Sequence, residues 1–324
     1  MWTTFKHLSC VTYLCLLIGC SSVPNDTNAV TFTTSSPIWF EDIQTAKKHR
    51  GKAHLHIPEG SGPHPAVIVL HTSLGLGESE KHFKEVAQAQ GFAVALVDSF
   101  TPRGIHKIDD NQAEISEVSI LSDLYAVKAL LEQNPKIDKN AIGVVGFSKG
   151  ALPAFYSNLQ YVHNLYAKGT KPFAAHVAFY PWCGLTLQKL ETNKKPVQVH
   201  VGALDTITPP DLCRRLIAKI QKQDTRAAIE MHVYENARHA FEHPILKNLP
   251  RLPVGYAVPK DCRIVERPDG KFLETSQKLE INSDTFEQVI SGCSEKGASV
   301  SGNKAAAELA YARVFKFLDQ HMKR

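Results

Sequence analysis

Residues 141–150 read Ala-Ile-Gly-Val-Val-Gly-Phe-Ser-Lys-Gly, and this stretch decides the fold. Ala141 to Val145 are small or apolar and predict a buried strand, whereas a helix-compatible run begins at Ala151. Between them, Ser148 has a glycine two positions away on either side. This arrangement is typical of a nucleophile elbow, a turn too tight for side chains at the glycine positions, which exposes the serine hydroxyl at the carboxyl edge of a sheet. The alternative is an ordinary tight turn between a strand and a helix.

The rest of the chain alternates strand patterns with helical patterns. Strands are expected at 53–57, 66–70, 92–97, 142–145, 176–179, 197–201 and 229–234. Helices are expected at 78–90, 112–133, 151–160, 211–221 and 304–321. This alternation predicts an α/β fold with a mostly parallel central sheet and helices on both faces.

A serine hydroxyl is a poor nucleophile, so it needs a general base, a group that orients the base, and donors for the developing oxyanion. Asp205 follows the strand expected at 197–201, and His239 follows the strand expected at 229–234. Alone, each is an ordinary loop residue: a turn-capping Asp or a solvated His. Their order after Ser148 is that of the α/β-hydrolase fold, which predicts a Ser148-His239-Asp205 triad.

Two backbone amides are expected to bind the oxyanion. One belongs to Lys149, the residue after the nucleophile. The other is expected from residues 71–75, which follow the strand at 66–70, with the amide of Ser73 favoured and that of Thr72 next.

The chain resembles the dienelactone hydrolase family of α/β-hydrolases over about residues 50–243 and the last helix. The motifs that carry the resemblance are Asp98-Ser99-Phe100-x-Pro102-Arg103-Gly104, the elbow at 146–150, Gly202-Ala203-Leu204-Asp205 and His239-Ala240-Phe241. The resemblance implies a cofactor-free hydrolase of esters or lactones. Two departures matter: the namesake enzymes have a cysteine where this chain has Ser148, and a glutamate where it has Thr72. Both favour a general serine esterase.

Two further residues are candidates for substrate binding. Arg103 falls close to where the family places an arginine that holds a substrate carboxylate; the alternative is a salt bridge within its loop. Trp182 is expected at the carboxyl edge of the sheet, where it either lines an acyl or alcohol pocket or packs under a disulfide at Cys183.

The N-terminus is predicted to be a targeting segment. Lys6 and His7 precede an apolar run that is too short for a stable transmembrane helix and that closes on Leu-Ile-Gly-Cys-Ser at 17–21. This end resembles the lipobox of bacterial lipoproteins, which implies a signal peptide at 1–19, a lipid on Cys20 and an outer-membrane destination. The alternative is a cleaved signal and a secreted or periplasmic protein. Residues 20–36 are expected to be a tether to a hydrolase domain at 37–324.

Four cysteines remain in the expected domain, which is consistent with disulfides in an oxidising compartment. Three pairings are possible. The favoured one joins Cys183 to Cys213, across two loops at one sheet edge, and Cys262 to Cys293. The second pair would close an insertion at about 244–303, a proline-rich segment expected to form either a cap over the site or an irregular surface excursion.

Composition excludes some other classes. The chain has 324 residues, 43% of them hydrophobic, with a formal net charge of +5 and no long run of Lys or Arg, so no nucleic-acid partner is expected. No metal is expected either, because His239 and His243 lack a third ligand. The rival functions are a thioesterase or peptidase with the same triad, and a non-catalytic lipoprotein that binds a ligand or a partner.

Overall fold

The computed structural model describes residues 28–323 except 247–251, 254–255, 259–260 and 294. The signal peptide, Cys20 and the first part of the expected tether therefore lie outside the described residues.

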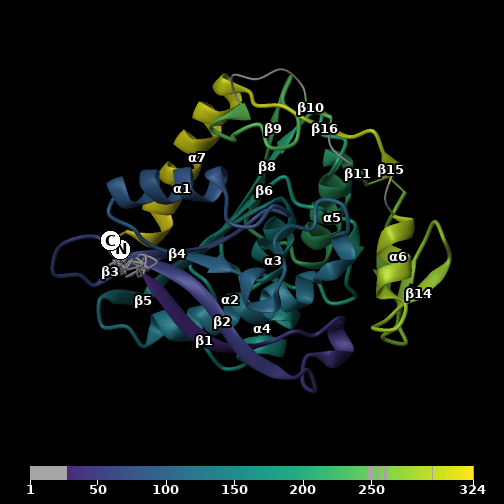
Figure 1. Ribbon diagram of the computed structural model, residues 1–324, viewed down its shortest axis with the longest axis horizontal. Helices are drawn as coiled ribbons and strands as arrows, with labels where there is room; N and C mark the ends of the chain where they lie inside the picture. The colour runs from purple at the N-terminus through teal and green to yellow at the C-terminus, as the bar shows by residue number, and fades with distance from the viewer. Residues whose placement is uncertain (1–27, 247–251, 254–255, 259–260, 294, 324) are drawn as a thin grey trace, which may run out of the picture.

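An eight-stranded sheet, in the order β1-β2-β4-β3-β5-β6-β8-β9, forms the centre of the structure (Figure 1). Strands β1 and β2 run antiparallel to their neighbours, and the rest of the sheet is parallel. The strands are β1 (Ala29–Ser35), β2 (Lys48–His56), β3 (His64–Leu70), β4 (Ala93–Asp98), β5 (Ile137–Phe147), β6 (His176–Phe179), β8 (Val197–Gly202) and β9 (Ile229–Tyr234). The carboxyl ends of β5, β8 and β9 thus meet at one edge.

Helices cover both faces of this sheet, as the alternating pattern predicts. On one face, side chains such as Val67 and Val69 pack against α1 (Glu78–Ala89) and α7 (Lys304–Met322). The alternate residues of β3, such as Ile68, face α2 (Glu117–Glu132), α3 (Ala151–Tyr156), α4 (Gln160–Ala167) and α5 (Pro210–Gln223). Both layers are apolar because a parallel sheet is buried on both sides.

Two expectations about boundaries were wrong. Residues 29–35, expected in the tether, form β1 and pair in register with β2 from Ala29–His54 to Ser35–Lys48, so the domain begins earlier than residue 37. The helix expected at 112–133 begins only after Ser116, whose side chain accepts a hydrogen bond from the amide of Ser119. The residues before it, Gln112–Glu114, form a separate 3₁₀ turn.

The segment at 244–303 is a small folded unit rather than an irregular excursion. Its strands β12 (Ile264–Glu266), β13 (Phe272–Glu274) and β14 (Leu279–Ile281) form a four-stranded sheet with β7 (Leu185–Thr186), and α6 (Phe286–Gly292) follows. The remaining strands form short two-stranded ribbons: β10 (Leu252–Pro253) with β16 (Ser299–Val300), and β11 (Tyr256–Ala257) with β15 (Glu295–Lys296).

Aromatic side chains attach this unit to the N-terminal part of the domain. Phe272 stacks on Phe40 with ring centroids 5.3 Å apart, and Trp39 contacts the rings of both Phe272 and Phe286. Backbone contacts also reach the carboxyl edge of the central sheet, since the amide of Val258 donates to Ile207 O, in the loop after β8, at 3.1 Å. The insertion is therefore packed beside the loops that follow β8 and β9.

Both favoured disulfides are present, Cys183–Cys213 and Cys262–Cys293. The first joins the loop after β6 to α5, and the second joins the residues just before β12 to the end of α6. The predicted pairing is thus confirmed.

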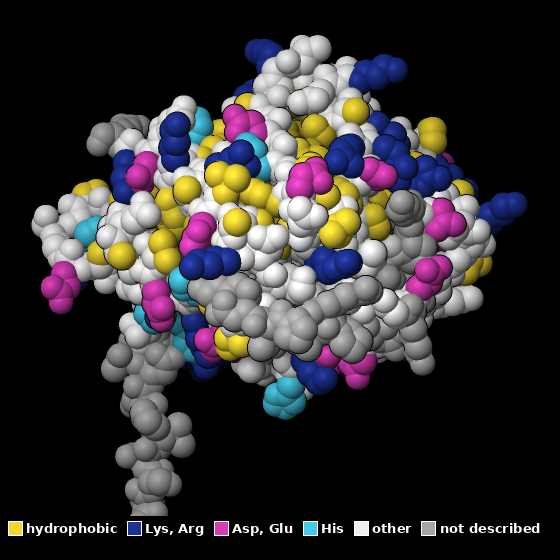
Figure 2. Space-filling model, turned by 90° about the horizontal axis from the view of Figure 1, so that it is seen from above, with side chains coloured by type: hydrophobic (Ala, Val, Ile, Leu, Met, Phe, Trp, Pro, Cys, Tyr) yellow, Lys and Arg dark blue, Asp and Glu magenta, His cyan; other side chains and the backbone are white. Residues whose placement is uncertain are grey.

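The described surface shows no strong segregation of charge on the face in Figure 2, where Lys and Arg are interspersed with Asp and Glu around exposed hydrophobic side chains. Within the described residues, no helix is both long enough and apolar enough to cross a membrane.

Candidate active site

Ser148 occupies the turn between β5 and the following helices, with a φ of 50°. This left-handed conformation is strained for a non-glycine residue and is common at functional turns. A Cβ on Gly146 would lie 2.1 Å from the carbonyl oxygen of Gly150, and one on Gly150 would lie 2.6 Å from Leu70 Cβ. The two glycines are therefore required sterically, as the elbow interpretation expects.

The three residues expected to form a triad lie in one hydrogen-bonded chain. Ser148 Oγ is 2.8 Å from His239 Nε2, and His239 Nδ1 is 2.8 Å from Asp205 Oδ2. Asp205 and His239 are buried, whereas Ser148 is partly exposed. With Nδ1–H donating to the carboxylate, Nε2 is left as the acceptor for the serine proton.

The loop after β8 holds the Asp205 carboxylate in place. Oδ1 accepts hydrogen bonds from the amides of Ile207 and Thr208, at 2.8 and 2.9 Å. Thr208 Oγ1 also lies 3.0 Å from Asp205 Oδ2 and 3.2 Å from His239 Nδ1. Thr208 was not among the residues expected from the sequence, although an Asp followed three residues later by Thr, just before Pro209, is a recognisable turn-capping pattern.

Tyr180 supports the imidazole from another side, and it too was missed. Its ring centroid lies 4.4 Å from that of His239, and its hydroxyl donates to Glu242 Oε1 at 2.7 Å. Ser79 donates to the same oxygen at 2.8 Å. Burial raises the pKa of the Tyr180 phenol well above its usual value, so the phenol stays protonated and remains a donor.

In the loop after β3, the amides on either side of Ser73 are already bonded. The amide of Thr72 donates to Glu80 Oε1 at 3.0 Å, and that of Leu74 donates to Thr72 Oγ1 at 3.2 Å. Across the part of the chain that the structure describes, no such bond is found for the amide of Ser73. Of the two expected donors in this loop, Ser73 is thus the one left available to a ligand.

Lys149 directly follows Ser148, and its ammonium group forms an ion pair with Glu117. Its Nζ lies 2.9 Å from Glu117 Oε1 and donates to the carbonyl of Gln112 at 3.0 Å, and the side chain is almost fully buried. Glu117 and Gln112 carried no recognisable signal in the sequence. Lys149 therefore fixes neighbouring segments rather than offering a charge to a substrate.

Arg103 does not match its expected role as a carboxylate receptor. Its guanidinium forms a bidentate pair with Asp123 at 2.8 and 3.0 Å. Its other bonds go to Ser99 O, Ser35 O and Ser36 Oγ. A guanidinium has five N–H groups, and these contacts use all five. The structure thus contains a salt bridge, as the alternative interpretation expected, but its partner is Asp123 of α2 rather than a residue of the same loop.

Trp182 lies between the core and the insertion. It lines an apolar cavity of about 10 Å³ with residues that include Trp39, Leu152 and Ile264. That volume holds about one water molecule, so no acyl or alcohol group fits there in this conformation. Trp182 packs against the insertion at this cavity, and its expected role in lining an acyl or alcohol pocket stays a prediction.

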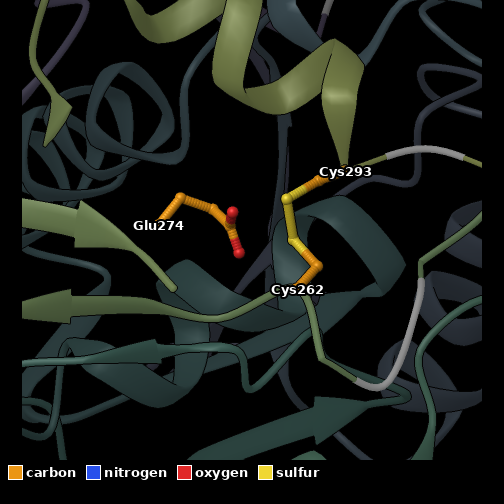
Figure 3. A group of neighbouring side chains, drawn as sticks. All are labelled: Cys262, Glu274 and Cys293. Atoms are coloured by element: carbon orange, nitrogen blue, oxygen red, sulfur yellow. A yellow bond between two sulfur atoms is a disulfide. The ribbon is translucent and has the colours of Figure 1, made fainter. Parts of the chain in front are cut away.

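Among the residues that the structure describes, one group has a metal-like composition, namely Cys262, Glu274 and Cys293, with ligand atoms within 4.8 Å of one another. Figure 3 shows the Glu274 side chain extending toward the disulfide that joins the two cysteines. Neither sulfur is a thiolate, and the carboxylate accepts bonds from the amides of Arg263, Ser276 and Gln277. Burial raises the pKa of Glu274, but these bonds outweigh it and lower the pKa overall. The group is a hydrogen-bonded carboxylate, not a metal site.

The sequence matches the family model of the dienelactone hydrolase family over residues 52–322. The chain belongs to this family. Its members are hydrolases of the α/β-hydrolase fold. No curated protein matches the sequence.

Solved structures of family members have the same fold. A dienelactone hydrolase from Klebsiella pneumoniae matches with a TM-score of 0.53 and 16% identity, over 90% of this chain and 99% of that one. A dienelactone hydrolase-like promiscuous phosphotriesterase from metagenomic libraries matches with a TM-score of 0.56 and 15% identity, over 91% and 99%. At these identities the comparison establishes the fold alone.

Proposed function

We propose that the protein hydrolyses carboxylic esters through an acyl-enzyme. The observation that carries the proposal is the unbroken chain from Ser148 Oγ through His239 to Asp205, with both links 2.8 Å long. In a family of hydrolases, this chain supplies a nucleophile, a general base and a group that orients the base.

In the first step, Ser148 Oγ attacks the carbonyl carbon while His239 Nε2 takes its proton. Asp205 stabilises the resulting imidazolium, and the amides of Ser73 and Lys149 donate to the oxyanion. The tetrahedral intermediate expels the alcohol, which receives the proton from His239. Water then attacks the acyl-enzyme with His239 as base, the acid is released, and Ser148 recovers its proton.

The proposed substrates are esters without a carboxylate near the scissile bond. In the family resemblance, an arginine near position 103 would hold such a carboxylate. Here Arg103 has no N–H left to donate, and Lys149 is paired with Glu117. A substrate carboxylate would thus lose hydration without gaining a partner from either residue, which is unfavourable.

Covalent labelling with a fluorophosphonate tests the chemistry. The wild-type protein should be labelled, and Ser148→Ala should lose both labelling and about 10⁴-fold of its turnover of p-nitrophenyl butyrate. Ser157→Ala, a buried serine at the end of α3, is the matched control and should retain labelling. A folded wild-type protein that is neither labelled nor active would instead favour the non-catalytic binding protein.

The substrate class is tested with a pair of esters of similar length. We expect higher kcat/KM for p-nitrophenyl butyrate than for the mono-p-nitrophenyl ester of succinic acid, which carries a free carboxylate. A clear preference for the succinate ester would contradict the proposed class but not the triad. Thioester and peptide substrates, assayed with the wild type and Ser148→Ala, show whether the same triad also acts as a thioesterase or a peptidase.

We also propose, from the sequence alone, that Cys20 carries a lipid that anchors the protein in the bacterial cell envelope. Cells supplied with labelled palmitate should incorporate it into the wild-type protein but not into Cys20→Ala. Cys15→Ala, in the expected signal peptide, is the control and should still be labelled. Unlipidated wild-type protein in the periplasm or medium would support the secreted alternative.

A further inference from the structure

We infer that Gln112 is a positioning residue that aligns the two amides of the oxyanion hole, an inference that rests on the proposed function. Gln112 lies in the 3₁₀ turn Gln112–Glu114 that precedes α2, and among the described residues no hydrogen bond joins it to Ser148 or His239. It is bonded instead to both residues whose amides are expected to bind the oxyanion.

On one side, Gln112 is bonded to Ser73. Ser73 Oγ donates to Gln112 Oε1 at 3.0 Å, and Gln112 Nε2 donates to Ile108 O at 2.8 Å. The amide of Ile108 in turn donates to Ser73 O at 2.8 Å. These three bonds close a ring that includes the Ser73 side chain and its carbonyl oxygen, so the residue that bears the amide is held relative to Gln112.

On the other side, the backbone of the same residue is bonded to Lys149. Lys149 Nζ donates to Gln112 O at 3.0 Å and pairs with Glu117 Oε1 at 2.9 Å, with the ammonium almost fully buried. Because the bonds to Ser73 and to Lys149 use opposite ends of one residue, a shift of Gln112 moves both donor segments together.

The amides themselves are on separate elements. Ser73 follows β3, Lys149 follows β5, and no bond is found between Ser73 and Lys149 within the described ranges 28–246 and 261–293. An oxyanion hole stabilises charge only if both donors are fixed before the reaction, because reorganisation during the step would consume the gain. Strands β3 and β5 are paired as far as Leu70 and Gly146, and the amide of Gly150 donates to His71 O at 3.1 Å. Gln112 adds a connection beyond the ends of these strands, at Ser73 and Lys149 themselves.

The insertion lies behind this turn. Helix α6 packs against Gln112–Glu114, and its last residue is followed by Cys293, which the disulfide joins to Cys262. The insertion thereby limits movement of the turn away from the nucleophile. This packing explains how a segment more than 130 residues further along the chain bears on the oxyanion hole without contacting substrate.

The test uses three variants of the full protein: Gln112→Leu, Ser73→Ala and the double variant. Leucine has a similar size but cannot form the two side-chain bonds, and alanine keeps the amide of Ser73 while removing its hydroxyl. We expect each single change to lower kcat for p-nitrophenyl acetate by about 10- to 100-fold with KM altered by less than about threefold, since misplacing a donor affects the transition state more than the bound ester.

Two readouts separate positioning from a structural role. The double variant should be no slower than Gln112→Leu, because both changes break the same Ser73–Gln112 bond. A trifluoromethyl ketone, which forms an oxyanion on Ser148, should bind more weakly by the same factor that kcat/KM falls. Glu114→Ala, an exposed change in the same turn, should match the wild type in both assays.

The inference is overturned if Gln112→Leu and Ser73→Ala, both folded, keep wild-type kcat, or if the losses simply multiply in the double variant. If Gln112→Leu does not fold, Ser73→Ala decides by the same criteria. A wild-type protein that fails fluorophosphonate labelling would overturn the proposed function instead. The two failures are therefore distinguishable.

Discussion

Asp205 and Glu274 are both buried carboxylates, and both accept hydrogen bonds from amides of their own loops. The difference is what lies opposite. Asp205 Oδ2 faces His239 at 2.8 Å, whereas Glu274 lies beside the disulfide of the insertion and closes a turn. In the proposed function the first arrangement orients a base, whereas the second stabilises a loop. Hydrogen bonds from the local loop therefore do not reveal the role of a carboxylate. The role depends on which group the fold places beside its other oxygen.

The largest effect is expected from exchanging these two carboxylates for amides. Asp205→Asn should lower kcat for p-nitrophenyl butyrate by about 10³- to 10⁴-fold, because an amide favours the wrong tautomer of His239. Glu274→Gln should leave kcat unchanged and lower the free energy of unfolding by about 1–3 kcal/mol. Equal losses of activity in both variants would remove the distinction.

Asp123 is a third buried carboxylate, and its partner is a cation. Its pair with Arg103 is buried, so Arg103→Ala should lower the free energy of unfolding by about 3–5 kcal/mol by leaving Asp123 unpaired. Urea unfolding measures this change. Arg214→Ala, which breaks an exposed pair with Asp211, is the control and should cost less than about 1 kcal/mol. The substrate-binding role of Arg103 would be supported instead if Arg103→Ala lost little stability and its kcat/KM fell specifically for esters that carry a carboxylate.

The two disulfides extend the comparison between the catalytic edge and the insertion. They close loops of nearly equal length, with separations of 30 and 31 residues. Loop entropy therefore predicts that replacing either pair of cysteines by serines lowers the free energy of unfolding by a similar amount, about 2–4 kcal/mol. Calorimetry or urea unfolding of the two double variants measures them. If the insertion pair contributed much less, the insertion would be unfolding separately from the core.

The smallest expected effect is on the pH dependence of stability, and it comes from the buried imidazole of His176. His176 is fully buried, and burial lowers its pKa to about 3, although a hydrogen bond to Ala154 O opposes the shift. The unfolded chain takes up this proton below about pH 6.5 and the folded chain does not, so the free energy of unfolding falls by about 1.4 kcal/mol per pH unit below pH 6.5.

His176→Asn should reduce this slope between pH 6 and 5, as measured by urea unfolding at each pH. Between pH 6 and 5, the slope of the free energy of unfolding against pH should be the same in Glu274→Gln as in the wild type. The pKa of Glu274 is lowered, so the contribution of this carboxylate to stability is lost only below about pH 4.5. An unchanged slope in His176→Asn would show that other groups account for it.

Prediction from sequence worked where one local pattern imposes one geometry. The Gly-x-Ser-x-Gly turn requires its strained serine, and the apolar runs of β3 and β5 can only be buried strands. It failed where a pattern permits several partners. Residues 29–35 have a tether-like composition, yet β2 offers an unpaired edge that they cover. Arg103 was placed correctly in its loop, but nothing in the sequence reveals that Asp123, twenty residues away, takes up its guanidinium.

The sequence by itself determined seven of the eight strands of the central sheet, the position of the elbow and the types of residue at Ser148, Asp205 and His239. Strand periodicity and steric limits act over a few residues, and they can therefore be recognised without the fold. Only the tertiary structure decided that these side chains meet, that Arg103 is used internally, and that Gln112 lies between Ser73 and Lys149. Each of these depends on contacts between segments far apart in the chain, whose geometry is set by sheet order and packing rather than by local preference.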